Sequence, residues 1–161
     1  MSFALHRIDD RLIHGQVLVA WGSRLDPQRM WVVDDAVASS PWEKQLFADA
    51  APGIGVQVLT VAEAIAAHAG EAVAPGSTFL LVRDLATARR LQDGGVRVAS
   101  WNVGGLHYAP GKAKVNEYVY LDEADRLDAR ALLTAGVALD VQDVPASKAM
   151  TLVALEPTVQ P

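Results

Sequence analysis

Short apolar runs alternate along the chain with segments in which apolar residues recur at helical spacing. The apolar runs predict strands at residues 3–8, 30–33, 56–59, 77–82, 96–103, 115–121 and 137–144. The helical spacing predicts helices at residues 15–25, from 41 to a stop at 52–53, 60–70, from 84 to a stop at 94–95, 122–136 and 147–155. We expect residues 155–161 to form a frayed tail.

Residues that favour helix ends support these boundaries. Thr60 and Glu63 have the spacing of a capping box, in which each side chain accepts a hydrogen bond from the backbone N–H of the other. Asp84 is placed to cap the next helix, and Gly94-Gly95 is placed to end it. The local pattern and the helix-end residues therefore predict the same elements.

This alternation is typical of a single α/β domain. We expect residues 1–161 to form one domain around a mostly parallel, open sheet of about seven strands with helices on both faces. Ligands bind such sheets outside the carboxyl ends of the strands. We call this edge the rim, and it should carry the polar residues that follow the predicted strands: Asp9 to His14, Asp34-Asp35, Thr60, Arg83-Asp84 and Asn102 to Lys112.

Composition and charge narrow the classes of function. With 51% hydrophobic and 20% charged residues, the 161-residue chain is not typical of disorder and can bury one core. The formal net charge of −5 disfavours nucleic acid as a partner of the whole molecule. The lack of cysteine excludes disulfides and suits a reducing cytoplasm. Residues 1–7 lack a signal-peptide pattern and no run is long enough to span a membrane, so we expect a cytoplasmic protein without direct membrane insertion.

The junction between the first strand and the first helix carries the strongest candidate chemistry. His14 stands there, and a neutral imidazole can attack phosphorus. Arg11 can grip two phosphoryl oxygens and spread the charge that develops on them. Backbone amides of residues 13–17, including those of Gly15 and Gln16, can hold a remaining oxygen at the start of the helix. These groups together could carry a phosphoryl group.

The acidic pair before Arg11 has three interpretations. Asp9 and Asp10 can orient Arg11 or one ring nitrogen of His14, because a carboxylate placed against a phosphate would repel it. They can instead cap the helix while His14 hydrogen-bonds the backbone. They can also bind a divalent cation, although a receiver domain would need an aspartate where Thr60 ends the third strand. We predict neither a metal nor a cofactor.

The stretch around His14 resembles a known family. Arg7-Ile8-Asp9-Asp10-Arg11-Leu12-Ile13-His14-Gly15-Gln16-Val17, with Trp21 behind it, is similar to the active-site segment of IIB subunits in the mannose/sorbose/fructose branch of the bacterial phosphotransferase system. Further blocks resemble the family in the same order, namely Val32 to Ala38, Gly94 to Val96, Asn102 to Gly105, Gly111-Lys112 and Val115-Asn116. The resemblance covers most of the chain.

The resemblance implies a phosphohistidine carrier. It implies that His14 accepts a phosphoryl group on Nδ1 from a histidine of a IIA domain. The group would then pass to a sugar bound by IIC and IID membrane subunits, with which the protein would associate peripherally. Arg11 would be catalytic beside His14, supported by Asp9, Asp10, Gly15 and Gln16. Two alternatives remain open: a regulatory phosphoprotein of the same fold without sugar transfer, and a metal-assisted hydrolase that uses the acidic pair.

Other residues on the rim are candidate contacts for phosphate or a partner: Asp35, Asn102, Gly104 and Lys112. Asp34 departs from the family pattern, which often has Asn or Ser there, and adds a negative charge near the rim. His107 and Tyr108 either contact a partner or are ordinary loop residues. The remaining histidines and three tryptophans are expected to be structural: His6, His68, Trp21, Trp31 and Trp42.

Overall fold

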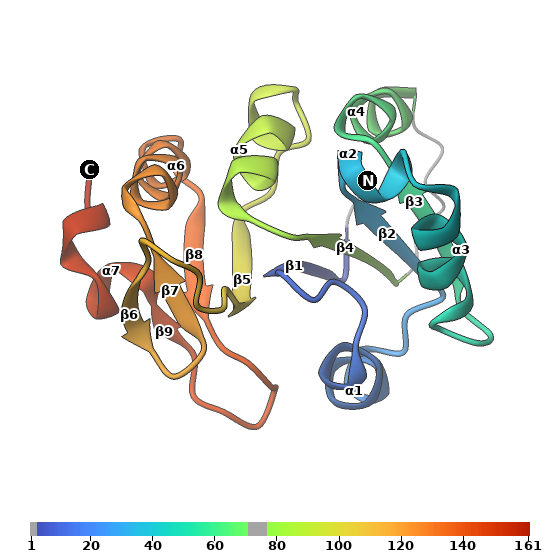
Figure 1. Ribbon diagram of the computed structural model, residues 1–161, viewed down its shortest axis with the longest axis horizontal. Coiled ribbons are helices and arrows are strands. Elements are labelled where there is room, and N and C mark those ends of the chain that lie inside the picture. Colours follow the sequence, from blue (N-terminus) through green and yellow to red (C-terminus); the bar gives the residue numbers. More distant parts are fainter. Residues whose placement is uncertain (1–2, 71–76) are drawn as a thin grey trace.

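The computed structural model describes residues 3–70 and 77–161 (Figure 1). Met1 and Ser2, which belong to the segment where we expect no signal peptide, lie outside the described residues. The described residues form a seven-stranded sheet in the order β3-β2-β4-β1-β5-β8-β9. Its strands are β1 (Leu5–Asp9), β2 (Arg29–Val33), β3 (Gly55–Leu59), β4 (Thr78–Val82), β5 (Ser100–Gly105), β8 (Ala138–Val141) and β9 (Met150–Thr151).

Neighbouring strands are parallel throughout this sheet, apart from the antiparallel pair of β8 and β9. The predicted mostly parallel sheet is therefore confirmed. Strand β1 lies at its centre, between β4 and β5. After β1 the chain crosses to β2 on one side of the sheet, and after β5 it crosses to β8 on the other side. The loops after β1 and β5 therefore lead in opposite directions, and ligands bind such sheets in the crevice between two loops of this kind.

Helices cover both faces of the sheet, as predicted. Figure 1 shows α4, α5 and α6 in a row over one face and α1 against the other. The helical elements are η1 (Gln16–Trp21), α1 (Gly22–Leu25), α2 (Asp35–Ala38), α3 (Pro41–Asp49), α4 (Val61–Gly70), α5 (Leu85–Asp93), α6 (Glu123–Thr134), α7 (Leu152–Leu155) and η2 (Pro157–Val159). Of these, η1 is a π-helical turn that runs directly into α1.

Each face of the sheet has its own apolar core. On one face, residues of α4, α5, α6 and α7 pack on β1, β2, β4, β5 and β8. On the other, the loop after β1, η1, α2 and the end of α3 pack on β1 to β4 only. Beyond β1 on this second face lies a hollow of about 290 Å³, lined by polar and apolar residues that include Leu5, Ser100, Asn102, Asp140 and Gln142. Burial is thus less complete over β5 and β8, beside the start of β1.

Two predicted strands differ from the structure. The strand predicted at 96–103 begins only at Ser100 and extends to Gly105, so Gly104 belongs to a strand rather than to a loop. The run at 115–121 is a hairpin of β6 (Ala113–Asn116) and β7 (Val119–Leu121), which forms a separate antiparallel sheet. The Asn116 side chain accepts a hydrogen bond from the Tyr118 N–H and so closes the turn inside this alternating run.

The predicted frayed tail at 155–161 is wrong. Residues 157–159 form η2, and Val159 is fully buried in the core beneath it. Arg130 of α6 donates to the Thr158 carbonyl at 2.9 Å, which holds this turn on the domain. The helix predicted at 147–155 is also shorter than expected, because β9 precedes α7.

The predicted helix ends are confirmed at two places. Thr60 and Glu63 exchange hydrogen bonds of 3.1 and 2.7 Å, and Asp84 accepts from the Thr87 N–H at 2.8 Å. Trp42 was expected to be a structural residue, but it lies outside the core and is 69% exposed on α3. Within the described ranges, no helix is long and apolar enough to cross a membrane.

Candidate functional site

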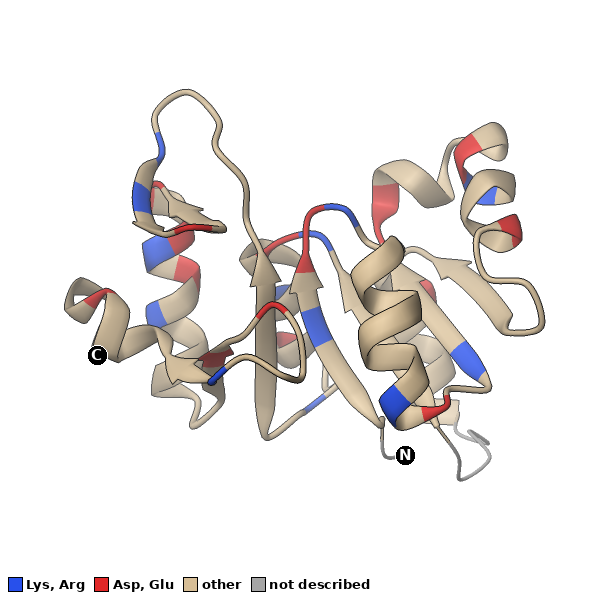
Figure 2. Cartoon of the chain, turned by 90° about the horizontal axis from the view of Figure 1, so that it is seen from below, with Lys and Arg blue, Asp and Glu red and all other residues tan. Residues whose placement is uncertain are grey.

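Asp9 is the centre of a buried ion-pair network at the end of β1. Its side chain is 2% exposed, and Oδ2 accepts from Arg7 Nη2 at 2.9 Å. The same oxygen lies 2.8 Å from His14 Nε2, and Oδ1 lies 3.2 Å from Arg11 Nε. One carboxylate therefore joins two guanidinium groups and the imidazole. Figure 2 shows acidic and basic residues side by side where the chain leaves β1.

The network lowers the pKa of Asp9. Burial by itself would raise this pKa, because it removes the charged form from water. Hydrogen bonds from His14 and Arg11 and the charge of Arg7 outweigh burial, and hold the pKa well below the usual range. Asp9 is consequently a carboxylate at neutral pH and can only accept hydrogen bonds.

Arg7 is the deepest member of the network. It is fully buried, and its Nη1 donates to Asn102 Oδ1 at 2.6 Å and to the Gln142 carbonyl at 3.3 Å. Burial lowers the pKa of Arg7, while Asp9 acts in the opposite direction. A Cβ atom on Gly104 would lie 1.9 Å from Arg7 Cζ, so only glycine leaves room for this guanidinium. Asn102 and Gly104 thus adjoin the Asp9 network through Arg7.

A tight turn brings His14 back over Asp9. Leu12 adopts a φ of 57°, a left-handed conformation that costs free energy in a non-glycine residue, and its side chain is fully buried. His14 is 15% exposed and directs Nε2 to Asp9. Since Asp9 only accepts, Nε2 carries the hydrogen, and in the neutral ring Nδ1 keeps its lone pair. The Gln16 N–H points to Nδ1 at 3.4 Å.

Arg11 lies at the mouth of the site. Its side chain is 39% exposed, and Nη2 donates to Gln16 Oε1 at 3.0 Å and to Asp9 Oδ2 at 3.3 Å. Its ion-pair distance to Asp9, 3.2 Å, is longer than the 2.9 Å of Arg7, and its contact with Gln16 is exposed. Arg11 can therefore exchange them for contacts with an incoming anion without leaving the loop.

Asp10 contacts different partners from those expected. In the described part of the chain it bonds neither Arg11 nor His14. Its Oδ1 lies 2.6 Å from His107 Nδ1, its Oδ2 accepts from the His107 N–H at 2.7 Å, and its own N–H donates to the Gly105 carbonyl at 2.9 Å. The two neighbouring carboxylates thus diverge, which removes the shared ligand face that a cation held by the acidic pair would need.

Two predicted rim residues, Asp35 and Lys112, form contacts with helices. Asp35 accepts from the Val61 N–H at 2.8 Å and pairs with Arg90 at 2.8 Å, and both contacts lower its pKa. Lys112 pairs with Asp125 at 2.6 Å at the start of α6. Desolvation would lower the pKa of Lys112, but this pairing raises it. Asp35 and Lys112 are thus engaged away from the Asp9 network.

Sequence reasoning named Arg7 and Arg83 but gave neither of them a role. Arg7 and Asp9 lie two residues apart on a strand, which places opposite charges on one face, and this spacing was the available signal. Arg83 follows β4, and its Nε donates to Asp34 Oδ2 at 2.7 Å while Nη1 reaches the Asp10 carbonyl at 3.4 Å. The unusual charge of Asp34 is therefore neutralised, and its Oδ1 caps α2 at the Val37 N–H.

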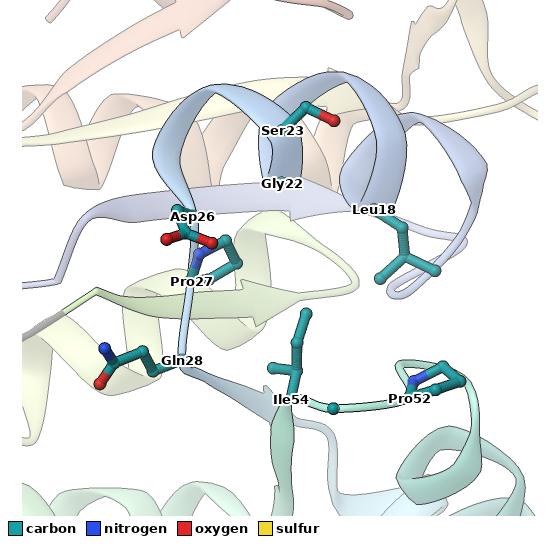
Figure 3. Close-up of a pocket in the computed structure, with 9 residues that line it drawn as sticks. Leu18, Gly22, Ser23, Asp26, Pro27, Gln28, Pro52 and Ile54 are labelled. Carbon is teal, nitrogen blue, oxygen red and sulfur yellow. The ribbon is translucent and has the colours of Figure 1, made fainter.

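A larger hollow lies elsewhere in the molecule. Leu18, Gly22, Asp26, Gln28, Pro52 and Ile54 are among the residues that line it, and its volume is about 400 Å³ (Figure 3). The loops that line it lead into the starts of β2 and β3, at the edge opposite to the rim. None of the candidate phosphoryl-handling residues borders it. Among the described residues, no three histidine or acidic side chains are arranged to hold a metal ion.

The chain resembles known proteins along nearly its whole length. The sequence profile of the family described as PTS system sorbose subfamily IIB component matches residues 3–158. The N-acetylgalactosamine-specific phosphotransferase enzyme IIB component 1 of Escherichia coli K12 is 36% identical over 146 residues, which cover 89% of this chain and 92% of that protein.

Two further similarities add a longer relative and a solved structure. The PTS system mannose-specific EIIAB component of Escherichia coli K12 is 38% identical over 157 residues, or 95% of this chain, but the match spans only about half (49%) of that protein. The crystal structure of the IIBSor domain of the sorbose permease from Klebsiella pneumoniae superposes with a TM-score of 0.90 at 31% identity, covering 96% of each chain.

Proposed function

The chain belongs to the sorbose subfamily of phosphotransferase system IIB components, and we propose that His14 is its phosphoryl carrier. In this proposal, His14 accepts a phosphoryl group from a histidine of a IIA domain and passes it to a sugar bound by IIC and IID membrane subunits. The members of this family are components of sugar phosphotransfer. The identity of the carrier residue, its partners and the mechanism are our proposals.

The hydrogen bond between Asp9 and His14 carries the proposal. It fixes the hydrogen on Nε2, so the Nδ1 lone pair can attack phosphorus once the long contact from the Gln16 N–H is released. As the Nδ1–P bond forms, the P–N bond of the donor breaks, and the donor imidazole keeps that electron pair. The phosphorylated ring retains its Nε2 hydrogen and is cationic. Asp9 stabilises this cation and so keeps the imidazole a good leaving group for the next transfer.

Arg11 and the start of η1 handle the charge of the phosphoryl group. Arg11 can turn from Gln16 toward two phosphoryl oxygens, because its guanidinium is already at the mouth of the site. The N–H of Gln16, which points to Nδ1, lies where a third oxygen can accept it, and Gly15 before it leaves the approach open. Arg7 stays buried and keeps Asp9 in place.

Two partners must reach the same imidazole in turn. The donor and the sugar-bearing subunits would therefore dock over the mouth formed by Arg11 and Gln16 and compete for it. The mannose-specific relative carries IIA and IIB in one component, as its name states, which supports a IIA donor. Docking on membrane subunits would place this protein at the cytoplasmic side of the membrane without an apolar span.

Phosphoryl uptake tests the proposal directly. The protein would be incubated with the phosphorylated IIA portion of the mannose-specific EIIAB component, and the label mapped by mass spectrometry under alkaline conditions. We expect acid-labile label on His14, with a ¹⁵N signature of Nδ1 substitution. His68→Ala is the matched histidine control and should take up label normally. Label on another residue, or on Nε2, would refute the assignment.

Sugar transfer needs a second assay. Membranes that contain IIC and IID subunits should remove label from the phosphorylated protein only when a transported sugar is present. Label that stays on His14 with every sugar, while another soluble protein responds to it, would favour the regulatory alternative. Simultaneous binding of donor and membrane subunits would contradict the shared docking site.

A further inference from the structure

Two histidine–carboxylate pairs lie side by side at the end of β1. Asp9 pairs with His14, and the next residue, Asp10, pairs with His107 from the segment after β5. His107 makes two bonds to this carboxylate, one from its backbone N–H at 2.7 Å and one at Nδ1 at 2.6 Å. The mechanism above uses the first pair and leaves the second without a role.

The second pair borders the first. A Cβ atom on Gly105 would lie 3.0 Å from His107 Cε1 and 3.2 Å from Asp9 Oδ1, so the His107 ring and the Asp9 carboxylate flank the same backbone position. The pairing of β1 with β5 becomes irregular between Ile8 and Asp9. Regular strand pairing therefore stops just where the loop that carries His14 begins, and the contacts of Asp10 continue the attachment to β5.

The contacts between Asp10 and His107 can offset the strain in the loop that carries His14. The loop after Asp10 contains Leu12 in its left-handed conformation and ends at His14, so it needs contacts that outweigh the strain. Hydrogen bonds to an ionised acceptor are among the stronger ones in proteins. Nδ1 of His107 must donate to the Asp10 carboxylate, and it can do so in the neutral and in the protonated ring.

We infer that His107 is a positioning residue for phosphoryl transfer at His14. It acts through Asp10, which begins the loop that carries His14. This inference rests on the proposed function. Since a misplacement of about 1 Å can cost about a hundredfold in rate, we expect loss of the His107 side chain to slow transfer about tenfold. The backbone N–H of His107 remains in any variant, so Asp10→Ala, which removes both bonds, should slow transfer more.

Two matched substitutions separate this role from direct contact with a partner. His107→Asn keeps an N–H donor near the position of Nδ1, whereas His107→Gln moves the amide out to the position of Nε2. A residue that acts through Asp10 is rescued by Asn and not by Gln. A residue that reaches the partner with Nε2 shows the opposite order. Glu117→Gln, on the exposed turn of the β6–β7 hairpin, is the control and should transfer at the parent rate.

Single-turnover transfer from the phosphorylated IIA portion, with its concentration varied, gives the rate at saturation and the half-saturating concentration separately. We expect His107→Ala and His107→Gln to lower the saturating rate with little change in half-saturation, and the double variant with Asp10→Ala to be no slower than Asp10→Ala alone. Parent-like rates in His107→Ala, or rescue by Gln rather than Asn, would overturn the inference.

A measurement without phosphate distinguishes the two proposals. In the unphosphorylated protein, His107→Ala and His107→Gln should broaden or shift the ¹⁵N ring signals of His14, and His107→Asn should restore them, while thermal unfolding stays cooperative in all three. If the parent takes up no phosphoryl group, the proposed function fails and this comparison alone decides the inference. Unchanged His14 signals in His107→Ala would then refute it.

Discussion

The ion pairs of Asp9 and those at the starts of α4 and α6 differ in depth and in consequence. Asp9 is almost inaccessible and joins Arg7, Arg11 and His14. Asp35 is half exposed and joins α2 to α4 and α5, and Lys112 joins the segment after β5 to α6. Asp9 is the last residue of β1, and Arg11, His14, Asp35 and Lys112 follow strands on the same rim.

The difference lies in what each group could do without its partner. Exposed ion pairs typically contribute about 0–1 kcal/mol, because water solvates either member alone. Water does not reach Asp9 and Arg7, so removing one of them leaves the other as an unpaired buried charge. The same burial fixes the orientation of His14. Both kinds of ion pair lie on the rim. The burial of Asp9 is what distinguishes the candidate site from the more exposed pairs of Asp35 and Lys112.

His14→Ala should have the largest effect on function. The variant should accept no phosphoryl group, while its melting temperature should change little, because His14 lies in a loop and Asp9 keeps its pairs with Arg7 and Arg11. Uptake from a phosphorylated IIA portion and a thermal melt measure the two quantities. Labelled His14→Ala protein, or an unfolded variant, would contradict the assignment.

Asp9→Asn should nearly abolish transfer while keeping the size of the side chain. An amide can donate to Nε2 of His14, which moves the ring hydrogen to Nδ1 and blocks attack. The same change in a serine-protease triad costs about 10⁴-fold, and we expect about 10³- to 10⁴-fold here. The single-turnover rate measures this. A loss below about tenfold would mean that Asp9 does not set the tautomer.

The Asp9 variant should also change the acid stability of the fold. The pKa of Asp9 is lowered on folding, so its contribution is present above the unfolded-state pKa of about 3.9 and is lost as pH falls below it. Denaturant unfolding of parent and Asp9→Asn should differ by about 3–5 kcal/mol at pH 7. This difference should shrink below about pH 4. A difference independent of pH would show that packing, not charge, explains the loss.

Arg11→Lys should slow transfer without weakening the fold. Lysine keeps the charge but loses the planar pair of donors, and removal of one preorganised donor costs about tenfold to a thousandfold. The half-exposed position of Arg11 predicts little change in unfolding free energy. Saturating single-turnover rates decide the matter. If Arg11→Lys transferred at the parent rate, the backbone amides at the start of η1 would be the groups that stabilise the phosphoryl charge.

Lys112→Ala should have the smallest effect. Its pair with Asp125 connects helix α6 to the segment after β5, so we expect a loss of about 1 kcal/mol in unfolding free energy. The saturating transfer rate should stay within about twofold of the parent, in contrast to Arg11→Lys. A large loss of rate in Lys112→Ala would bring this lysine into the phosphoryl site.

The sequence by itself determined the alternation of elements and the segment that carries His14. Hydrophobic spacing and caps such as Asp84 are local, so the described strands and helices between residues 5 and 93, apart from the short α2, were predicted within a few residues. Local signals failed where alternation continued through a turn, as at Asn116. They also failed at Val159, since a lone apolar residue gives no pattern and only contact with the domain buries it.

Only the tertiary structure decided which polar residues meet His14. The sequence placed Asp9 and Asp10 together, yet strand alternation and the turn at Leu12 send one carboxylate to His14 and the other to His107. Arg7 stood within an apparently apolar run, and its burial depends on acceptors from β5 and from the end of β8, which lie far away in the chain. A buried charge is tolerated only when its partners surround it, and those partners come together only in the folded sheet.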